Sequence, residues 1–187
     1  MCFRERKVTS GNQFLERNSG VSVYKLPRLQ VCLTLFSARN NSSALVRSAL
    51  IENTIIDFIK QGCVVEVFEE PTIISPLSLS IQKSGKKAPN FDLRHINKFL
   101  HKKTFRCEEL GVAKEILRPA DYMFYFDIKL CYHHVDICPD HQKCLSFSWV
   151  FSCGRTRVFQ FTVLPFGLSS APHLFTKLFK RLIKKWR

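Results

Sequence analysis

The sequence predicts an α+β fold, in which short strands and two amphipathic helices build one core. Two segments, residues 41–62 and 172–187, have apolar residues at helical spacing. Short apolar or alternating runs between them have the length of strands: residues 64–67, 73–81, 145–150 and 158–164. With 187 residues, 45% of them hydrophobic, and 17 phenylalanines, the chain can bury a core as one domain or as part of a larger one.

Residues 1–35 are expected to form a poorly ordered basic arm. Polar, basic, Gly and Ser positions alternate along them, and the apolar run at 31–36 lacks turn residues of its own. The first helix is expected to begin after residues 41–43, which offer N-cap side chains. It should end at Gly62, and its apolar face is expected to include Leu45, Ala49, Ile55 or Ile56, and Ile59.

Residues 64–67 and 73–81 are expected to be strands separated by an acidic turn at 69–71. A tight basic turn follows at 83–87, and then the hexapeptide DLRHIN at 92–97. A basic hairpin tip is more often a solvated turn than a ligand site. Residues 95–121 predict a connection with a helix around 108–117 that ends before Pro119.

The stretch YMFYFDIKLCYHHV at 122–135 organises the rest of the chain. Residues 122–126 predict a strand buried on both faces, and Asp127 stands at its end. A buried carboxylate is costly unless a cation meets it, so a strand end with Asp127 and Tyr132 has the layout of a binding site. The alternative is an ordinary helix cap or turn aspartate.

Strands at 145–150 and 158–164 surround a turn at 153–156, and Phe159, Phe161 and Val163 alternate with polar residues on one predicted buried face. A Pro-x-Gly turn at 165–167 leads into the last helix. That helix separates an apolar side from a basic side, which is also typical of helices that bind membrane surfaces or protein partners.

The net charge of +14 lies in separate patches, with eight basic and two acidic residues in 1–50 and six basic and no acidic residues in 173–187. Such patches suit a polyanion, first nucleic acid and second a membrane surface. The eight cysteines are scattered singly and no signal peptide precedes them, so we expect reduced thiols and an intracellular protein, cytoplasmic or nuclear and not secreted. No transmembrane segment is expected, because the longest uncharged window, 158–176, contains two prolines and a glycine.

Six Cys and His residues between Cys131 and Cys144 suggest zinc as a further alternative. The spacing from Cys138 to Cys144 is compressed, contains Pro139 and has no second matching pair, so it does not favour a closed four-ligand site.

The block at 122–135 and the block VLPFGLSSAPHLF at 163–175 together resemble motifs A and B of a reverse transcriptase palm, and DLRHIN resembles the fingers of the same enzymes. The residues in these blocks are similar to those of the polymerases of DIRS-type and gypsy-like retroelements. The resemblance implies the fingers and part of the palm of a right-hand polymerase, incomplete, with fingers at 36–120 and a partial palm at 121–187. Template-primer of RNA or DNA, dNTP and Mg²⁺ would then be its ligands.

The resemblance also implies residue roles. Asp127 would be the catalytic carboxylate and a metal ligand, together with the backbone carbonyl of Ile128. Tyr132 would be the aromatic gate that selects deoxynucleotides. The other implied nucleotide contacts are Lys83, Phe166 and Gly167, and the implied template or primer contacts are Asp92, Arg94 and Pro172.

Three departures from the family pattern affect the expected activity. Ala88 stands where the family has an arginine aimed at the triphosphate, followed by Pro89, and Leu130 and Cys131 stand where relatives have Ser and Gly. The sequence contains no aromatic-x-Asp-Asp block, which supplies the second metal carboxylate. We therefore expect that residues 1–187 do not polymerise alone, and that a larger polyprotein or a downstream RNase H region belongs with them. The alternatives are a non-catalytic nucleic-acid-binding remnant and a protein that acts through its last helix.

Overall fold

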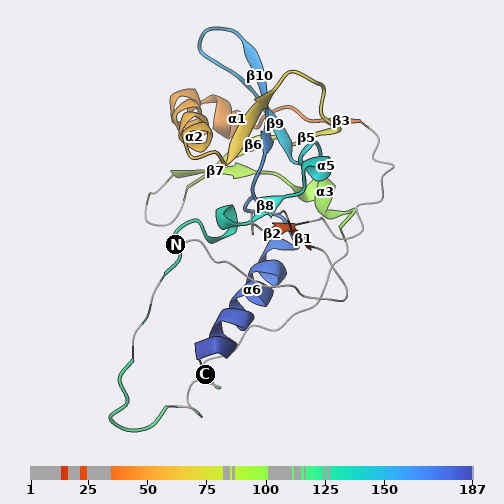
Figure 1. Ribbon diagram of the computed structural model, residues 1–187. Helices are drawn as coiled ribbons and strands as arrows, with labels where there is room; N and C mark the ends of the chain where they lie inside the picture. Colours follow the sequence, from red (N-terminus) through yellow and green to blue (C-terminus); the bar gives the residue numbers. More distant parts are fainter. Residues whose placement is uncertain are drawn as a thin grey trace.

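A five-stranded mixed sheet forms the centre of the protein (Figure 1). The computed structural model describes residues 14–16, 22–24, 35–81, 85, 87–100, 111, 115, 117–123, 125 and 127–186. The strand order is β3 (Phe36–Ser37), β5 (Ile73–Ile74), β9 (Ser146–Val150), β10 (Thr156–Phe161) and β4 (Val64–Val67). The strands from β3 to β9 are parallel, whereas β10 is antiparallel to both of its neighbours. The mixture of helices and strands confirms the α+β class.

The β9–β10 hairpin supplies the largest side chains of the core. Phe147 and Trp149 of β9 and Phe159 and Phe161 of β10 are almost fully buried, while Gln160 between the last two is only half-buried. Phe147 lies opposite Phe159 in the register, with ring centroids 5.3 Å apart. The alternation predicted for this strand pair is therefore confirmed, and it places the aromatic face inward.

The predicted first helix is divided into α1 (Ser42–Leu45) and α2 (Ser48–Lys60). Asn41 caps α1 as predicted, since its side chain accepts a hydrogen bond from the backbone N–H of Ser43 at 2.9 Å. The turn between the helices changes the helical phase, so the buried residues are Ala44, Ile51 and Ile55. The predicted face was wrong at Leu45, Ala49 and Ile59, which are exposed. Gly62 ends α2 with a φ of +69°, as expected for a glycine stop.

Residues 73–81 do not form the single strand that was predicted. The chain bends at Ser75 and Pro76, so β5 belongs to the central sheet, and β6 (Leu77–Ile81) pairs with β7 (Lys87–Phe91) in a separate hairpin. Pro89 lies opposite Leu79 within this hairpin and does not prevent it. The short helix α3 (Arg94–Asn97) follows β7 directly.

The predicted buried strand at 122–126 was wrong for its described residues. Tyr122 and Tyr125 are 102% and 97% exposed, Met123 is 74% exposed, and none of the three belongs to a strand. A strand buried on both faces needs a neighbouring strand and packing on each side, and no described residue provides either. Figure 1 shows this part of the chain running away from the sheet. The helix expected at 108–117 lies mostly outside the described residues.

A second, three-stranded sheet lies near the start of the last helix (Figure 1). Its strands are β1 (Phe14–Glu16), β2 (Ser22–Tyr24) and β8 (Asp136–Ile137), so the expected basic arm contains a hairpin among its described residues. The 3₁₀ helix η1 (Cys131–His134) precedes β8, and α5 (Pro139–Gln142) follows it.

The last helix, α6 (Ala171–Trp186), extends away from the central sheet (Figure 1). Ala171 and Leu174 in its first turn are buried in the core, while Lys177, Lys180 and Lys184 are exposed. Of the predicted apolar side, Phe175, Leu178 and Phe179 are half-buried, so the two-sided helix predicted from the sequence is confirmed at its described positions. In the part of the chain that the structure describes, no helix has both the length and the apolarity that crossing a membrane requires.

Candidate functional site

A cleft of about 500 Å³ lies between the β6–β7 hairpin, α3 and the turn before α6. The residues around it come from four parts of the sequence: Arg39, Asn41, Pro76, Leu77, Ser78, Asn90, Phe91, Asp92, Leu93, Arg94, Asn97 and Gly167. Three of them, Asp92, Arg94 and Gly167, are residues that the sequence analysis singled out. The cleft is lined mainly by polar side chains and backbone, with two exposed arginines, Arg39 and Arg94, so it suits a polar or anionic ligand.

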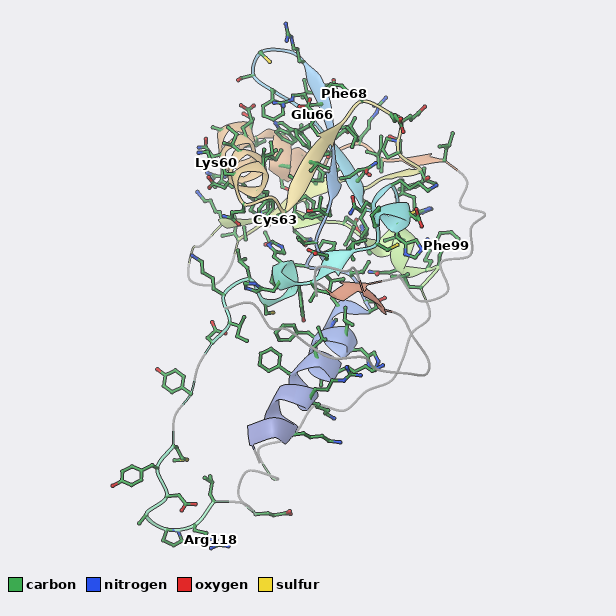
Figure 2. The ribbon with its side chains drawn as sticks, viewed as in Figure 1. Lys60, Cys63, Glu66, Phe68, Phe99 and Arg118 are labelled. Carbon is green, nitrogen blue, oxygen red and sulfur yellow. The ribbon has the colours of Figure 1, made fainter. Side chains whose placement is uncertain are left out.

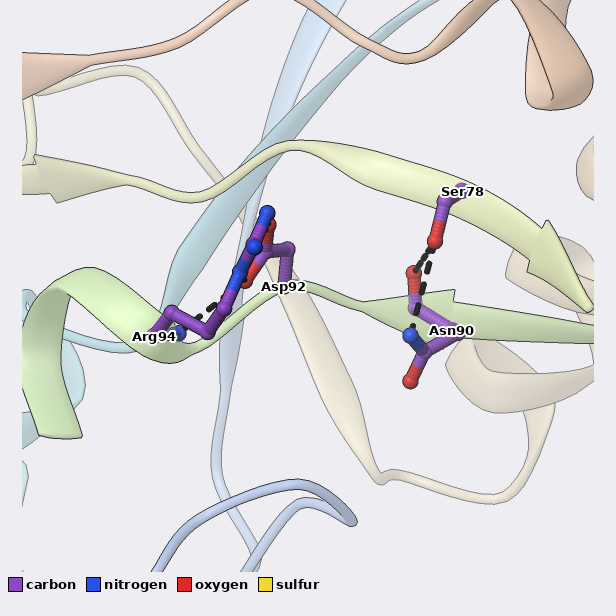
Figure 3. Close-up of polar contacts among 4 residues, drawn as sticks. All are labelled: Ser78, Asn90, Asp92 and Arg94. Carbon is purple, nitrogen blue, oxygen red and sulfur yellow. Dashed lines mark hydrogen bonds and ion pairs between the residues drawn. The ribbon is translucent and has the colours of Figure 1, made fainter.

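Arg94 and Asp92 form an ion pair at the edge of this cleft (Figure 3). The Nη2 and Nε groups of Arg94 donate to the two carboxylate oxygens at 2.6 to 3.0 Å, and the backbone N–H of Arg94 also donates to Asp92. The hydrogen bonds from the Arg94 side chain lower the pKa of Asp92. The pair leaves the Arg94 side chain 87% exposed, so its outer face remains accessible to a phosphate.

The side chain of Asn97 joins α3 to the turn at Gly167. Its Nδ2 group donates to the carbonyl of Gly167 at 2.9 Å, and its Oδ1 atom accepts from the N–H of Ser169 at 2.8 Å. Gly167 has a φ of +93°, and a Cβ atom there would lie 3.3 Å from the carbonyl oxygen of Phe91. Only glycine combines this backbone angle with so close an approach to β7.

Two predicted nucleotide-binding residues, Tyr132 and Phe166, lie in contact. Their ring centroids are 4.8 Å apart, although Tyr132 comes from η1 and Phe166 from the turn before α6. Phe175 of α6 packs edge-on against Tyr132 at 5.6 Å, and His133 packs edge-on against Phe166 at 5.4 Å. Phe166 remains 44% exposed, so the cluster presents an aromatic surface to solvent. Aromatic surfaces of this kind can pack against a sugar or a base.

His133 lies on the inner side of this cluster. Its ring packs edge-on against Phe58 of α2 at 5.5 Å, and its Nδ1 atom lies 3.6 Å from the Cys63 sulfur. Burial, and secondarily the neighbouring His134, lowers the pKa of His133, and burial raises the pKa of the Cys63 thiol. Both groups are therefore favoured in their neutral forms.

Asp127, the predicted metal ligand, is exposed, and Ile128 beside it is half-buried. Burial raises the pKa of Cys131. A backbone hydrogen bond at Tyr132 opposes this rise, and the negative charge of Asp127 adds to it. Among the described residues, no group of three or more His, Cys, Asp and Glu side chains is arranged to hold a metal ion. Asp127 offers the oxygen donor that Mg²⁺ prefers, but the described side chains do not complete a magnesium site around it.

The remaining predicted residues are placed as follows. Pro172 is exposed in the first turn of α6, and Ala88 is half-buried in β7. Lys83 lies outside the described residues. Leu130 has a left-handed backbone with a φ of 53°, a conformation that glycine or asparagine adopts more easily.

Sequence reasoning missed Arg39, Asn41 and Asn97 as residues of the site. Arg39 and Asn41 line the cleft only because Asn41 is held beside Leu77, whose carbonyl accepts the backbone N–H of Asn41 at 2.8 Å. Asn97 meets Gly167 across 70 residues of sequence. The signals available in the sequence were the polar run at residues 39–43 and the asparagine at the end of DLRHIN.

The family model of the reverse transcriptase (RNA-dependent DNA polymerase) matches residues 81–187, which is more than half of the chain. The chain therefore belongs to the reverse transcriptase family. No curated protein matches it.

Solved structures show the same fold. The native protease-reverse transcriptase of prototype foamy virus is similar with a TM-score of 0.61 and 19% identity, over 86% of this chain and 21% of that chain. The foamy viral protease-reverse transcriptase dRH in complex with ds DNA gives a TM-score of 0.59 and 20% identity, over 86% of this chain and 27% of that chain. The chain thus spans between a fifth and about a quarter of the length of these proteins.

Proposed function

We propose that these residues form the fingers and the front of the palm of a retrotransposon reverse transcriptase, which binds template-primer and dNTP. The observation that carries the proposal is the contact between Tyr132 and Phe166, because it joins the two motifs that resemble motifs A and B. The cleft beside Gly167, with the exposed Arg94, would hold the template strand. The aromatic surface of Tyr132 and Phe166 would contact the incoming nucleotide.

Mg²⁺ would be held by Asp127 and the carbonyl of Ile128, together with carboxylates that the described residues do not provide. When bound, it would neutralise charge on the nucleotide phosphates. Tyr132 and Phe166 would orient the sugar of the nucleotide by direct contact, and this contact needs no metal. For this reason we also propose that residues 1–187 bind substrates without extending a primer.

The test combines nucleotide binding with primer extension by purified protein carrying residues 1–187. Mg²⁺-dependent protection of the protein by dNTP in the presence of template-primer is expected, and Tyr132→Ala should abolish it. Primer extension is expected to be absent, and robust extension would contradict the proposed inactivity but not the binding. DNA sequencing downstream of the Arg187 codon tests whether the polymerase gene is truncated or interrupted, since an aromatic-x-Asp-Asp codon block in any frame would then be found there.

The second candidate function is a non-catalytic nucleic-acid-binding protein that retains the reverse transcriptase fold. Two observations favour it: Asp127 is exposed and no described residues complete a metal site with it, and Ala88 lies in β7. Salt-sensitive binding of nucleic acid without any effect of dNTP would select this function over the first.

A further inference from the structure

The side chain of Asn97 connects the two parts of the proposed site. Helix α3 begins at Arg94, which lines the cleft, and ends at Asn97 (Figure 3). The turn before α6 carries Phe166. Asn97 donates to the carbonyl of Gly167 and accepts from the N–H of Ser169, and among the described residues these are the hydrogen bonds that join α3 to the turn. The residue proposed to hold the template and the residue proposed to contact the nucleotide are therefore tied together through one side chain.

The two hydrogen bonds of Asn97 fix the backbone of the turn on either side of Leu168. The Leu168 side chain is buried, so packing anchors the turn in the core from the inside. On the outside, Gly167 and Ser169 are exposed, and Asn97 holds both of them. An asparagine side chain offers both a donor and an acceptor, which a carboxylate or an aliphatic side chain of the same size does not. Asn97 thus specifies one position of the turn relative to α3.

The exposure of Gly167 and Ser169 indicates that these hydrogen bonds matter more for position than for stability. If the Asn97 side chain is lost, water can reach both backbone groups and replace the hydrogen bonds, so little stability should be lost. Water does not fix the distance between α3 and the turn. The ring contacts of Phe166 hold the turn to η1 and not to α3.

We propose that Asn97 is a positioning residue, which sets Phe166 at a fixed distance from Arg94 and so aligns a nucleotide on Phe166 with a template strand in the cleft. This inference rests on the proposed function and deepens it. Asn97 acts on the nucleotide through the backbone of the turn. Holding a binding surface in its bound position improves affinity, because less freedom is lost when the ligand binds.

Amide hydrogen exchange of the ligand-free 187-residue chain tests the contact itself. The N–H of Ser169 is bonded to Asn97, so Asn97→Ala and Asn97→Leu should each raise its exchange rate about tenfold, the effect of one lost hydrogen bond. Asn97→Leu keeps the approximate shape of the side chain and removes its donor and acceptor. The amides of β9 and β10 should keep their exchange rates, which a general loss of stability would raise. Asn53→Ala is the matched control, since Asn53 is an exposed asparagine of α2, and it should leave the exchange of Ser169 unchanged.

The dissociation constant of dNTP, measured from protection in the presence of template-primer and Mg²⁺, tests the role of the contact. Asn97→Ala and Asn97→Leu should each raise it about five- to tenfold. The affinity for template-primer alone should change by less than about twofold, because both variants leave the Arg94 side chain and its ion pair with Asp92 in place. A general structural defect would weaken both kinds of binding, whereas a displaced turn weakens the binding of dNTP.

The outcomes distinguish the role of Asn97 from the proposed function. If the unaltered chain binds no dNTP, the proposed function fails, and the positioning role fails with it. If the unaltered chain binds dNTP and both Asn97 variants bind it equally well, or if the exchange of Ser169 is the same in all three proteins, the positioning role alone is overturned. Equal losses of affinity for dNTP and for template-primer would also overturn it.

Discussion

At Gly167, both the backbone conformation and the packing require a glycine. Its φ of +93° disfavours any other residue, and a Cβ there would press on the carbonyl of Phe91. We predict that Gly167→Ala lowers the free energy of unfolding by about 2 kcal/mol or more, measured by urea denaturation. Gly154→Ala is the matched control: its φ is +79° but its Cβ would meet open space, so it should cost only about 1 kcal/mol. Equal losses would show that the contact with β7 is unimportant.

His133 predicts a pH dependence of stability. Its pKa in the folded state is lowered, so the unfolded chain binds the proton more readily. The stabilisation is fully present above the ordinary histidine pKa of about 6.5, and it is lost as the pH falls from there through the lowered folded-state value. Urea unfolding between weakly acidic and neutral pH should show this loss.

The His133→Gln variant should show a weaker pH dependence than the unaltered chain. It should not become flat, because burial and Lys98 also lower the pKa of His95. His134→Gln is the control, because His134 is exposed and contributes less than burial to the shift at His133. A pH dependence of His133→Gln identical to that of the unaltered chain would exclude His133 as its source.

At the scale of elements, Asn40 connects the β6–β7 hairpin to the central sheet. Its Nδ2 group donates to the carbonyl of Ser148 at 2.9 Å, and its Oδ1 atom accepts from the N–H of Leu77 at 2.8 Å. We predict that Asn40→Ala lowers the free energy of unfolding by about 1 to 3 kcal/mol, since it leaves these backbone groups without their partner. Asn40→Asp keeps the acceptor for Leu77 but replaces the donor to Ser148 with a second acceptor oxygen, so it should also lower the free energy of unfolding. An unchanged free energy of unfolding for Asn40→Ala in urea denaturation would contradict this role.

The elements also show which structural features the sequence determines locally. The β9–β10 hairpin was predictable because its alternation and its turn lie within a few residues of each other. The strand at 122–126 was not, because apolarity alone does not specify a neighbouring strand, and no described residue pairs with it. The face of α2 was missed because a turn at 46–47 changes the helical phase.

The candidate site was predictable only in part. The motif resemblance predicted Tyr132 and Phe166 as nucleotide contacts; the structure brings their rings together, and the role itself stays a prediction. Arg39 and Asn97 reach the cleft through contacts between distant parts of the chain, and no local pattern marks such contacts.

At the scale of the whole molecule, the charge of +14 is carried in part by exposed cations on several elements. Arg39 and Arg94 line the cleft, while Lys177, Lys180, Arg181 and Lys184 are exposed along α6. A polyanion that contacts several of them releases counterions when it binds. We therefore predict that the affinity for a template-primer duplex falls steeply as the salt concentration rises, as measured by fluorescence anisotropy. Affinity that does not respond to salt would rule out this mode of binding.

Arg94 allows the cleft to be distinguished from the rest of this basic surface. Because Asp92 occupies the Nε and Nη2 groups, one side of the guanidinium stays available for a backbone phosphate. Arg94→Gln should weaken template-primer binding and reduce the slope of log affinity against log salt by about 0.9, the value for one lost phosphate contact on duplex DNA. Arg118→Gln is the control, since Figure 2 shows Arg118 far from Phe99, which follows α3. If the two variants change the slope equally, nucleic acid binds through general surface charge, and the cleft does not hold the template.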